Sequence, residues 1–211
     1  MPSAQDILNV LASISAGLVP LAIIWHVLFG LAVILVLIGW RPARKIGALL
    51  LCLPLLSVAI VSFFYDSPFN FIAFLLFAII LAVIAFRMKP DCLYHPPSWG
   101  VVFGWLMIFF AWIYPHFGTG SSWLFYLYGS PLGLIPCPTT SMVVGFALIA
   151  DGFRSRGWTW VLIILGLFYG LFGAIRLGVW IDVFLLLGTL MLVAEAVTLK
   201  RRCEISGDPL V

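Results

Sequence analysis

The chain has 211 residues, of which 64% are hydrophobic and only 9% are charged. A soluble domain carries roughly a quarter charged residues, and a water-soluble domain of this size cannot bury so much apolar surface. The composition therefore excludes an ordinary soluble domain and indicates a membrane protein. The net charge of +3 is small and the basic residues lie in short clusters between apolar runs, so no nucleic-acid partner is expected.

The first 16 residues predict a short amphipathic helix on the outer membrane surface. No basic region precedes the first apolar run, so no cleavable signal peptide is expected. Ser3 and Asp6 have the spacing of a capping box. The apolar residues that follow at helical spacing are Ile7, Val10, Leu11 and Ile14.

Seven apolar stretches follow, most of them close to the roughly 20 residues that a membrane-spanning helix needs. They predict an all-α polytopic bundle that forms a single transmembrane domain without a soluble module. Pro54 predicts a kink in the second span. The expected spans are residues 18–39, 46–65, 69–87, 98–115, 137–151, 158–176 and 179–199.

The distribution of basic residues predicts the orientation. If the spans alternate, ten of the eleven basic residues fall on one side and only Arg176 falls on the other. Basic residues gather on the cytoplasmic side of membrane proteins, so the N-terminus is expected outside and the C-terminus in the cytoplasm. The ten residues are Arg41, Arg44, Lys45, Arg87, Lys89, Arg154, Arg156, Lys200, Arg201 and Arg202.

The longest connection, residues 116–136, breaks the pattern because it is rich in aromatic residues and glycine rather than hydrophilic. Such a segment is typical of an interfacial or re-entrant stretch. The fifth span that follows is short: the 14 residues from Pro138 to Asp151 rise only about 21 Å as a helix, against a hydrocarbon core of roughly 30 Å. We therefore expect a composite crossing built from residues 120–151.

The fifth span begins with Pro136-Cys137-Pro138-Thr139-Thr140. A helix N-terminus at some depth favours anions and activates a thiol. Cys137, Thr139 and Thr140 are therefore predicted to line a ligand site. The alternative is structural: proline starts helices, small polar residues pack between helices, and buried cysteine usually acts as a small apolar residue.

This region resembles a bacterial family of multi-spanning membrane proteins that is known only as a domain of unknown function. The resemblance rests on Tyr114-Pro115, the glycine-rich connection, Gly133-Leu-Ile-Pro-Cys-Pro-Thr-Thr140 with Gly145, and the stretch from Gly173 to Asp182. It covers mainly the second half of the chain. It implies a location in the bacterial cytoplasmic (inner) membrane and points to the region of Cys137, but it supplies no activity.

Three further residues are candidates because ionisable groups within spans are often functional. His26 and His116 lie toward the outer ends of the first and fourth spans, where they and Cys137 could ligate a soft metal ion or haem. A lone helix histidine more often bonds a neighbouring helix. Arg176 is expected to form a salt bridge with Asp182 between the last two spans; the alternative is that it binds an anion.

Three functions remain open at this stage. The leading hypothesis is a small transporter or permease-like protein with its site at the start of the fifth span, lined by the candidates above. The second is a structural or accessory subunit of a larger membrane complex, and the third is a metal or haem redox protein. Gly166, Gly170 and Gly173 predict a close-packing face, either inside the chain or between copies.

No catalytic motif such as GxSxG, HExxH or a Walker sequence is present. An enzyme would need Cys137 and His116 to pair as nucleophile and base. We therefore expect membrane lipids as surroundings and either other membrane proteins or further copies of the chain as partners, rather than an enzyme with a defined cofactor.

Overall fold

A computed structural model of the chain describes residues 3–90, 96–115, 117 and 123–206, with side chains described as far as Thr198. The described part is all-helical, with 83% helix and no strand. In chain order the helices are α1 (Ala4–Gly17), α2 (Val19–Leu37), α3 (Arg44–Leu50), α4 (Cys52–Phe64), α5 (Pro68–Phe86), α6 (Ser98–Ile113), η1 (Trp123–Phe125), α7 (Tyr126–Gly129), α8 (Pro136–Ile149), η2 (Asp151–Arg154), α9 (Arg156–Leu171), η3 (Phe172–Arg176), η4 (Trp180–Asp182) and α10 (Val183–Ser206).

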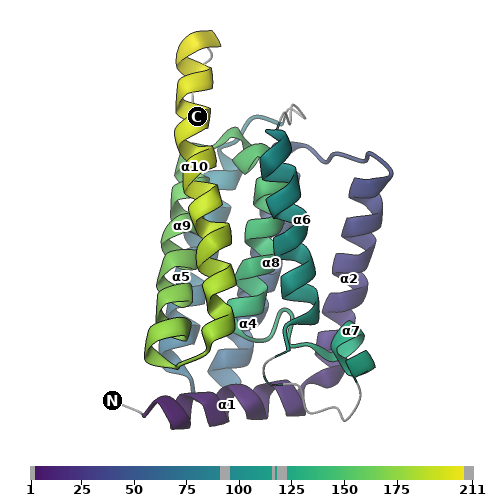
Figure 1. Cartoon of the computed structure of the whole chain (residues 1–211), viewed down its shortest axis with the longest axis vertical. Helices are drawn as coiled ribbons and strands as arrows, with labels where there is room; N and C mark the ends of the chain where they lie inside the picture. Colours follow the sequence, from purple (N-terminus) through teal and green to yellow (C-terminus); the bar gives the residue numbers. More distant parts are fainter. Residues whose placement is uncertain (1–2, 91–95, 116, 118–122, 207–211) are drawn as a thin grey trace.

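Five helical stretches are long and apolar enough to cross a membrane: Val19–Leu37, Arg44–Phe64, Pro68–Phe86, Arg156–Arg176 and Trp180–Thr198. The predicted all-helical membrane architecture is confirmed to this extent. The shorter apolar helices α6 and α8 run within the same bundle (Figure 1). Each of these seven stretches begins and ends within three residues of a predicted span, except that the helix of α10 continues to Ser206.

The helices form one bundle that α1 crosses at one end, while α10 ends at the opposite end (Figure 1). We call these the α1 end and the opposite end. Ser3 and Asp6 form the predicted capping box of α1. Leu11 and Ile14 on its apolar face are buried, because they pack with residues of α4, α6 and the start of α8.

Helix α8 is the centre of the bundle, packed against α4, α6, α9 and α10. Every residue from Pro138 to Leu148 is buried. Its closest neighbour is α6, because glycine faces glycine: a Cβ on Gly145 would lie 2.8 Å from the carbonyl oxygen of Gly104, and one on Gly104 would lie 2.8 Å from that of Gly145. These two glycines let the two backbones touch.

The predicted kink in the second span is present as the break between α3 and α4 at Leu51. Pro54 explains its position, because proline has no N–H for the carbonyl of Leu50 and its ring clashes with that carbonyl. The interruption of the helix at Leu51 therefore follows from a single residue.

The glycine face of α9 packs inside the chain. A Cβ on Gly166 would meet the side chain of Thr189, and one on Gly170 would meet Leu186 at 2.7 Å. At Gly173 the side chain of Asp182 occupies the space of a Cβ. Of the two alternatives for this face, the structure therefore has the internal one.

Helix α2 differs from the others because it packs chiefly on α7 and α1 and buries only three of its residues, Ala22, His26 and Phe29. In Figure 1 it stands beside the bundle rather than within it. One side-chain hydrogen bond ties it to α4, from Nε1 of Trp25 to Oγ of Ser57 at 2.9 Å.

Candidate functional site: a cavity at the start of α8

The chain reaches α8 through a buried, non-helical turn. Residues 129–136 are buried, after the short helix α7. Trp112 of α6 anchors this segment twice: its Nε1 donates to the carbonyl of Leu127 at 2.9 Å, and its carbonyl accepts from Oγ of Ser130 at 2.7 Å. Irregular backbone in a membrane protein is tolerated where protein surrounds it, and protein surrounds this turn.

Glycine is required within this turn. Gly133 has φ +70 and lies against the ring of Trp25, so a side chain there would be strained and would collide. Thr139 closes the turn, since its Oγ1 accepts from the backbone N–H of Gly133 at 3.0 Å and donates to the carbonyl of Ile135 at 2.7 Å. Thr139 therefore holds the entry to α8 in place.

The N-terminus of α8 offers fewer anion-binding groups than the sequence suggested. The helix begins at Pro136, so two of its first three residues, Pro136 and Pro138, have no N–H. The hydrogen-bonding part of the expected anion site is correspondingly weak.

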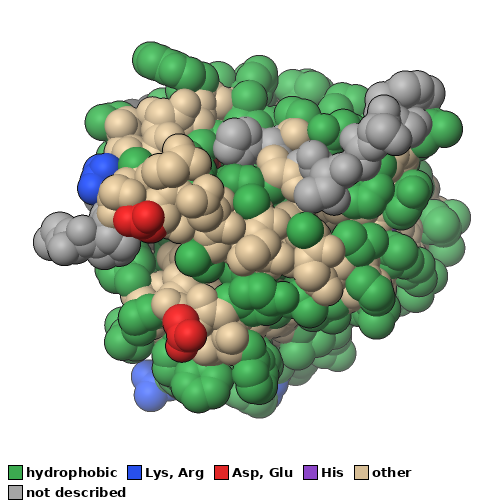
Figure 2. Space-filling view, turned by 90° about the horizontal axis from the view of Figure 1, so that it is seen from below, with side chains coloured by type: hydrophobic (Ala, Val, Ile, Leu, Met, Phe, Trp, Pro, Cys, Tyr) green, Lys and Arg blue, Asp and Glu red, His purple; other side chains and the backbone are tan. Residues whose placement is uncertain are grey.

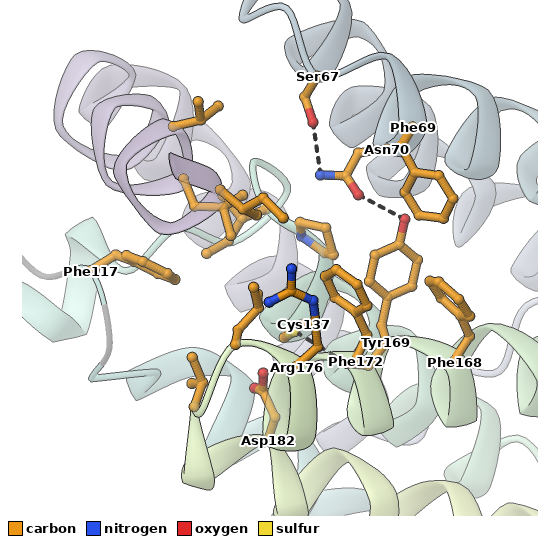
Figure 3. A pocket seen from close by; sticks show the side chains of 18 of the residues that line it. Ser67, Phe69, Asn70, Phe117, Cys137, Phe168, Tyr169, Phe172, Arg176 and Asp182 are labelled. Atoms are coloured by element: carbon orange, nitrogen blue, oxygen red, sulfur yellow. Dashed lines mark hydrogen bonds between the residues drawn. The ribbon is translucent and has the colours of Figure 1, made fainter. Parts of the chain in front are cut away.

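Beside this entry lies a cavity of about 570 Å³, which we call the α8 cavity. Its walls come from α1, the start of α5, Tyr114 after α6, the start of α8, the end of α9 with η3, and η4 (Figure 3). Exposed residues at its rim, among them Asp6, Asp66 and Arg176, show that it opens to the surface. Seen from the α1 end, that surface has hydrophobic side chains and exposed backbone over most of its area, with a few acidic groups on it and basic groups at its edge (Figure 2).

Three polar side chains from three different elements meet at the inner wall of the cavity. The hydroxyl of Tyr114 donates to Oδ1 of Asp182 at 2.7 Å. Both groups also interact with the thiol of Cys137, whose Sγ lies 4.0 Å from the carbonyl of Tyr169. Tyr114 and Asp182 are about 99% buried, whereas Cys137 is half-buried because it borders the cavity.

A second hydrogen-bonded chain lines the neighbouring wall. The hydroxyl of Tyr169 donates to Oδ1 of Asn70 at 2.9 Å, and Nδ2 of Asn70 donates to Oγ of Ser67 at 3.0 Å (Figure 3). Asn70 lies in the first turn of α5, and its side chain joins α5 to α9. It is buried, so it acts within the core of the site.

The rim carries the charged groups. Arg176, at the end of η3, projects toward the cavity (Figure 3). The expected salt bridge to Asp182 is not formed between these two described side chains, because the carboxyl of Asp182 is turned to Tyr114 and Cys137. Asp6, on α1, is fully exposed, and its hydrogen bonds from Ser3 lower the pKa of its carboxyl.

Of the predicted site residues, Cys137 and Arg176 line the cavity and Thr139 supports it from behind. Thr140 is fully buried away from the cavity, and its hydroxyl has no hydrogen-bond partner among the described residues. His26 is elsewhere: its Nδ1 lies 2.8 Å from the carbonyl of Ala22, and its ring packs on Trp112. His116 lies outside the described residues.

The described part of the chain contains no group of three His, Cys, Asp or Glu side chains that could hold a metal ion. Cys137 has Asp182 beside it, but His26 does not line the cavity. A metal or haem at Cys137 would therefore need ligands other than His26.

Sequence reasoning missed Tyr114, Tyr169 and Asn70 as site residues. Tyr114 and Tyr169 were hidden among many aromatic residues of an apolar chain. Asn70 could have been identified, because a polar side chain near the start of an apolar span is expected to have a hydrogen-bond partner.

Comparisons with known proteins do not assign a function to the site, so its interpretation rests on its geometry. No protein-family model, no curated protein and no solved structure matches the chain.

Proposed function

We propose that the chain is a small permease-like membrane protein that takes a hydrophobic organic cation into the α8 cavity from the outer side. It crosses a bacterial cytoplasmic membrane seven times, with the N-terminus outside and the C-terminus in the cytoplasm. The α8 cavity, with its buried polar wall at the entry to a central helix, is the observation that carries the proposal.

The segregation of charge supports this topology. The basic clusters lie in the connections after α2 and α5, in η2 with the start of α9, and near the end of α10, and all of these are at the opposite end of the bundle (Figure 1). Arg176, in η3, is at the α1 end. Under the positive-inside rule the opposite end is cytoplasmic, and the α8 cavity faces outward.

The cavity favours transport over the two alternatives. An accessory subunit needs no cavity at this place, and a filled interior would suit it as well. A redox or metal protein needs Cys137 and a histidine together, whereas His26 is occupied with Ala22 and Trp112. A cavity of about 570 Å³ is within the range of small-molecule sites, which are mostly apolar with a few placed polar groups.

The lining indicates the class of ligand. Among the described lining residues there are three acids, Asp6, Asp66 and Asp182, against one base, Arg176. Aromatic rings attract cations through their π faces, most strongly when water is excluded. The rings on the walls belong to Phe69, Tyr114, Phe117, Phe168, Tyr169 and Phe172.

Thiol accessibility tests the outward cavity. In a variant that keeps only Cys137 (Cys52→Ala, Cys92→Ser, Cys203→Ser), a membrane-impermeant thiol reagent added from outside is expected to label Cys137. The control moves the single cysteine to Ala147, which is fully buried in the same helix and does not line the α8 cavity, and it should stay unlabelled. A folded protein whose Cys137 resists the reagent contradicts the proposal.

Two probes of equal size and opposite charge test the ligand class. Tetraphenylphosphonium is expected to slow the labelling of Cys137, whereas tetraphenylborate is not. Asp182→Asn should weaken the phosphonium effect roughly tenfold, the change that about 1.4 kcal/mol produces. Protection by tetraphenylborate alone would refute a cation site and favour binding at Arg176.

A further inference from the structure

A second cavity, of about 310 Å³, lies toward the opposite end of the bundle. It runs between α2 on one side and α3, α4, the end of α8 and η2 on the other; we call it the α2 groove. Leu28, Leu31, Leu50 and Leu53 line it and are each about half exposed, so it is open along its length. The groove exists because α2 stands away from the bundle.

The lining of the α2 groove is apolar over a length that suits a hydrocarbon chain. Trp25, near one end, and Trp40, at the other, both line it. Fifteen residues separate them, which is roughly 22 Å along a helix. Phe29 and Phe146 close the wall at the back with their rings stacked at 6.0 Å.

A groove of this kind is not empty in a bilayer. An apolar gap does not attract water, and an unfilled gap forfeits the dispersion contacts of the side chains that line it. The surrounding solvent is lipid, and the groove opens toward it along the exposed face of α2. An acyl chain therefore has both access and a matching surface.

The charge at the end of the groove selects the headgroup. Arg41 is exposed and is the one charged residue among the described lining. Nearby, the guanidinium of Arg44 is turned inward, with one nitrogen 3.5 Å from the carbonyl of Phe153. Basic sites between helices at a membrane interface bind anionic lipid headgroups, and arginine pairs with phosphate through two parallel hydrogen bonds.

We propose that the α2 groove is a binding site for an anionic phospholipid, with one acyl chain along α2 and the phosphate at Arg41. The site is separate from the α8 cavity, and the proposal does not depend on transport. The lipid completes the packing of α2, which the protein alone leaves loose.

Lipid retention measured by native mass spectrometry tests this site. The protein is purified from mixed vesicles of phosphatidylglycerol and phosphatidylcholine with identical chains, and the lipids that remain bound are counted. We expect phosphatidylglycerol to be retained roughly fivefold over phosphatidylcholine, the ratio that about 1 kcal/mol per arginine near the membrane surface gives. Equal retention of the two lipids overturns the proposal, as does a lipid-free dimer.

Two variants separate the headgroup from the chain. Arg41→Gln should abolish the preference for phosphatidylglycerol but keep a bound lipid, whereas Ala32→Phe fills the groove and should lose both lipids. Arg87→Gln is the matched control, because Arg87 is an exposed arginine at the same end that does not line the groove. If Arg41→Gln and Arg87→Gln reduce the preference equally, the effect is general surface charge and the site is refuted; this comparison stands even if Ala32→Phe does not fold.

Discussion

The α8 cavity and the α2 groove use the two ends of the same helix in different ways. Pro136 and Cys137 border the cavity, whereas Phe146, Ile149 and Ala150 border the groove. The cavity has hydrogen-bonding groups from several helices on its walls, and the groove has apolar walls with one arginine at its end. Directional groups recognise a particular molecule, while apolar walls accept any chain of the right width.

Between the two sites α8 is packed solid. Every residue from Pro138 to Leu148 is buried, and no described cavity reaches through this layer. A transport cycle would therefore require α8 or its neighbours to move, as alternating access does in other membrane carriers. Helix α2 contacts this layer through the stacked rings of Phe29 and Phe146. The π-helical turn η3 borders the cavity, and such turns are frequent at functional sites.

The largest expected effect comes from the contact that supports both sites. Gly145→Ala should destabilise the protein by about 1–3 kcal/mol, because the new methyl would meet the Gly104 carbonyl and Ile108, both at 2.8 Å. Thermal unfolding in detergent, followed by loss of the monomer peak in size-exclusion chromatography, measures this. The protection of Cys137 by tetraphenylphosphonium and the retention of lipid should both decrease.

Gly157→Ala is the matched control for this prediction. Its nearest neighbour, Ile84, would be 3.8 Å from the new methyl, an ordinary contact. Alanine also favours a helix more than glycine does, so stability should stay equal or rise. A Gly145→Ala protein as stable as Gly157→Ala would show that α6 and α8 are less closely packed than the structure has them.

The next effect is confined to the α8 cavity. Tyr114→Phe removes the hydroxyl that donates to Asp182 and leaves a buried carboxyl without it. Hydrogen bonds between membrane helices contribute about 0.6 kcal/mol, with a maximum near 1.7, and this buried one should lie toward the upper value. A double-mutant cycle with Asp182→Asn, read by thermal unfolding, isolates the coupling.

The same cycle distinguishes the two sites. Tyr114→Phe should leave lipid retention in the α2 groove unchanged. Tyr128→Phe, which removes a hydroxyl from an exposed tyrosine of α7, should change neither property. A coupling near zero between Tyr114 and Asp182 would mean that their hydrogen bond contributes nothing to the cavity wall.

Much of the fold could be predicted because local rules decide it. Apolar length sets where spans lie, Pro54 sets the break between α3 and α4, and Ser3 with Asp6 sets the start of α1. These features depend on residues that are neighbours in the chain. The shortness of α8 could also be predicted, because the prolines at its start and Asp151 after its end leave only a short apolar stretch between them.

The site was predictable only in part, because it depends on which helices meet. Cys137 was predicted from its position at a helix start. Tyr114 and Asp182 are 68 residues apart, and no spacing in the sequence predicts the hydrogen bond between them. The salt bridge expected between Arg176 and Asp182 failed for the same reason. Gly173 leaves room for the Asp182 carboxyl against η3, where the carboxyl accepts from Tyr114 rather than from the arginine.

A smaller effect is expected at the wall of the α2 groove. Ser57→Ala removes the hydroxyl that accepts from Nε1 of Trp25, the side-chain hydrogen bond between α2 and α4. The loss should be about 0.6 kcal/mol and should appear as faster amide exchange in α2, measured by hydrogen–deuterium exchange. Ser13→Ala, which removes a local bond to the Val10 carbonyl in α1, is the control and should leave α2 unchanged.

The smallest expected effect is the pH response of Asp6 at the rim of the α8 cavity. Its carboxylate accepts from the N–H of Ser3 at 2.9 Å and from the Ser3 hydroxyl at 2.6 Å, which lowers its pKa below the ordinary 3.8. The fold therefore favours the ionised form. Its contribution is complete above pH 3.8 and is lost as the pH falls through the lower, folded value.

The first turn of α1 should accordingly keep its amide NMR shifts between pH 7 and 5 and fray only in stronger acid. Asp6→Asn should remove this pH response, and Ser3→Ala should move it toward pH 3.8, because the two hydrogen bonds that stabilise the carboxylate depend on the capping geometry of Ser3. Because Asp6 is fully exposed, the change should stay within α1, and Asp6→Asn should leave Cys137 labelling at pH 7 unaltered. An Asp6→Asn protein whose Cys137 labelling at pH 7 differs from that of the parent would show that α1 controls access to the cavity instead of only bordering it.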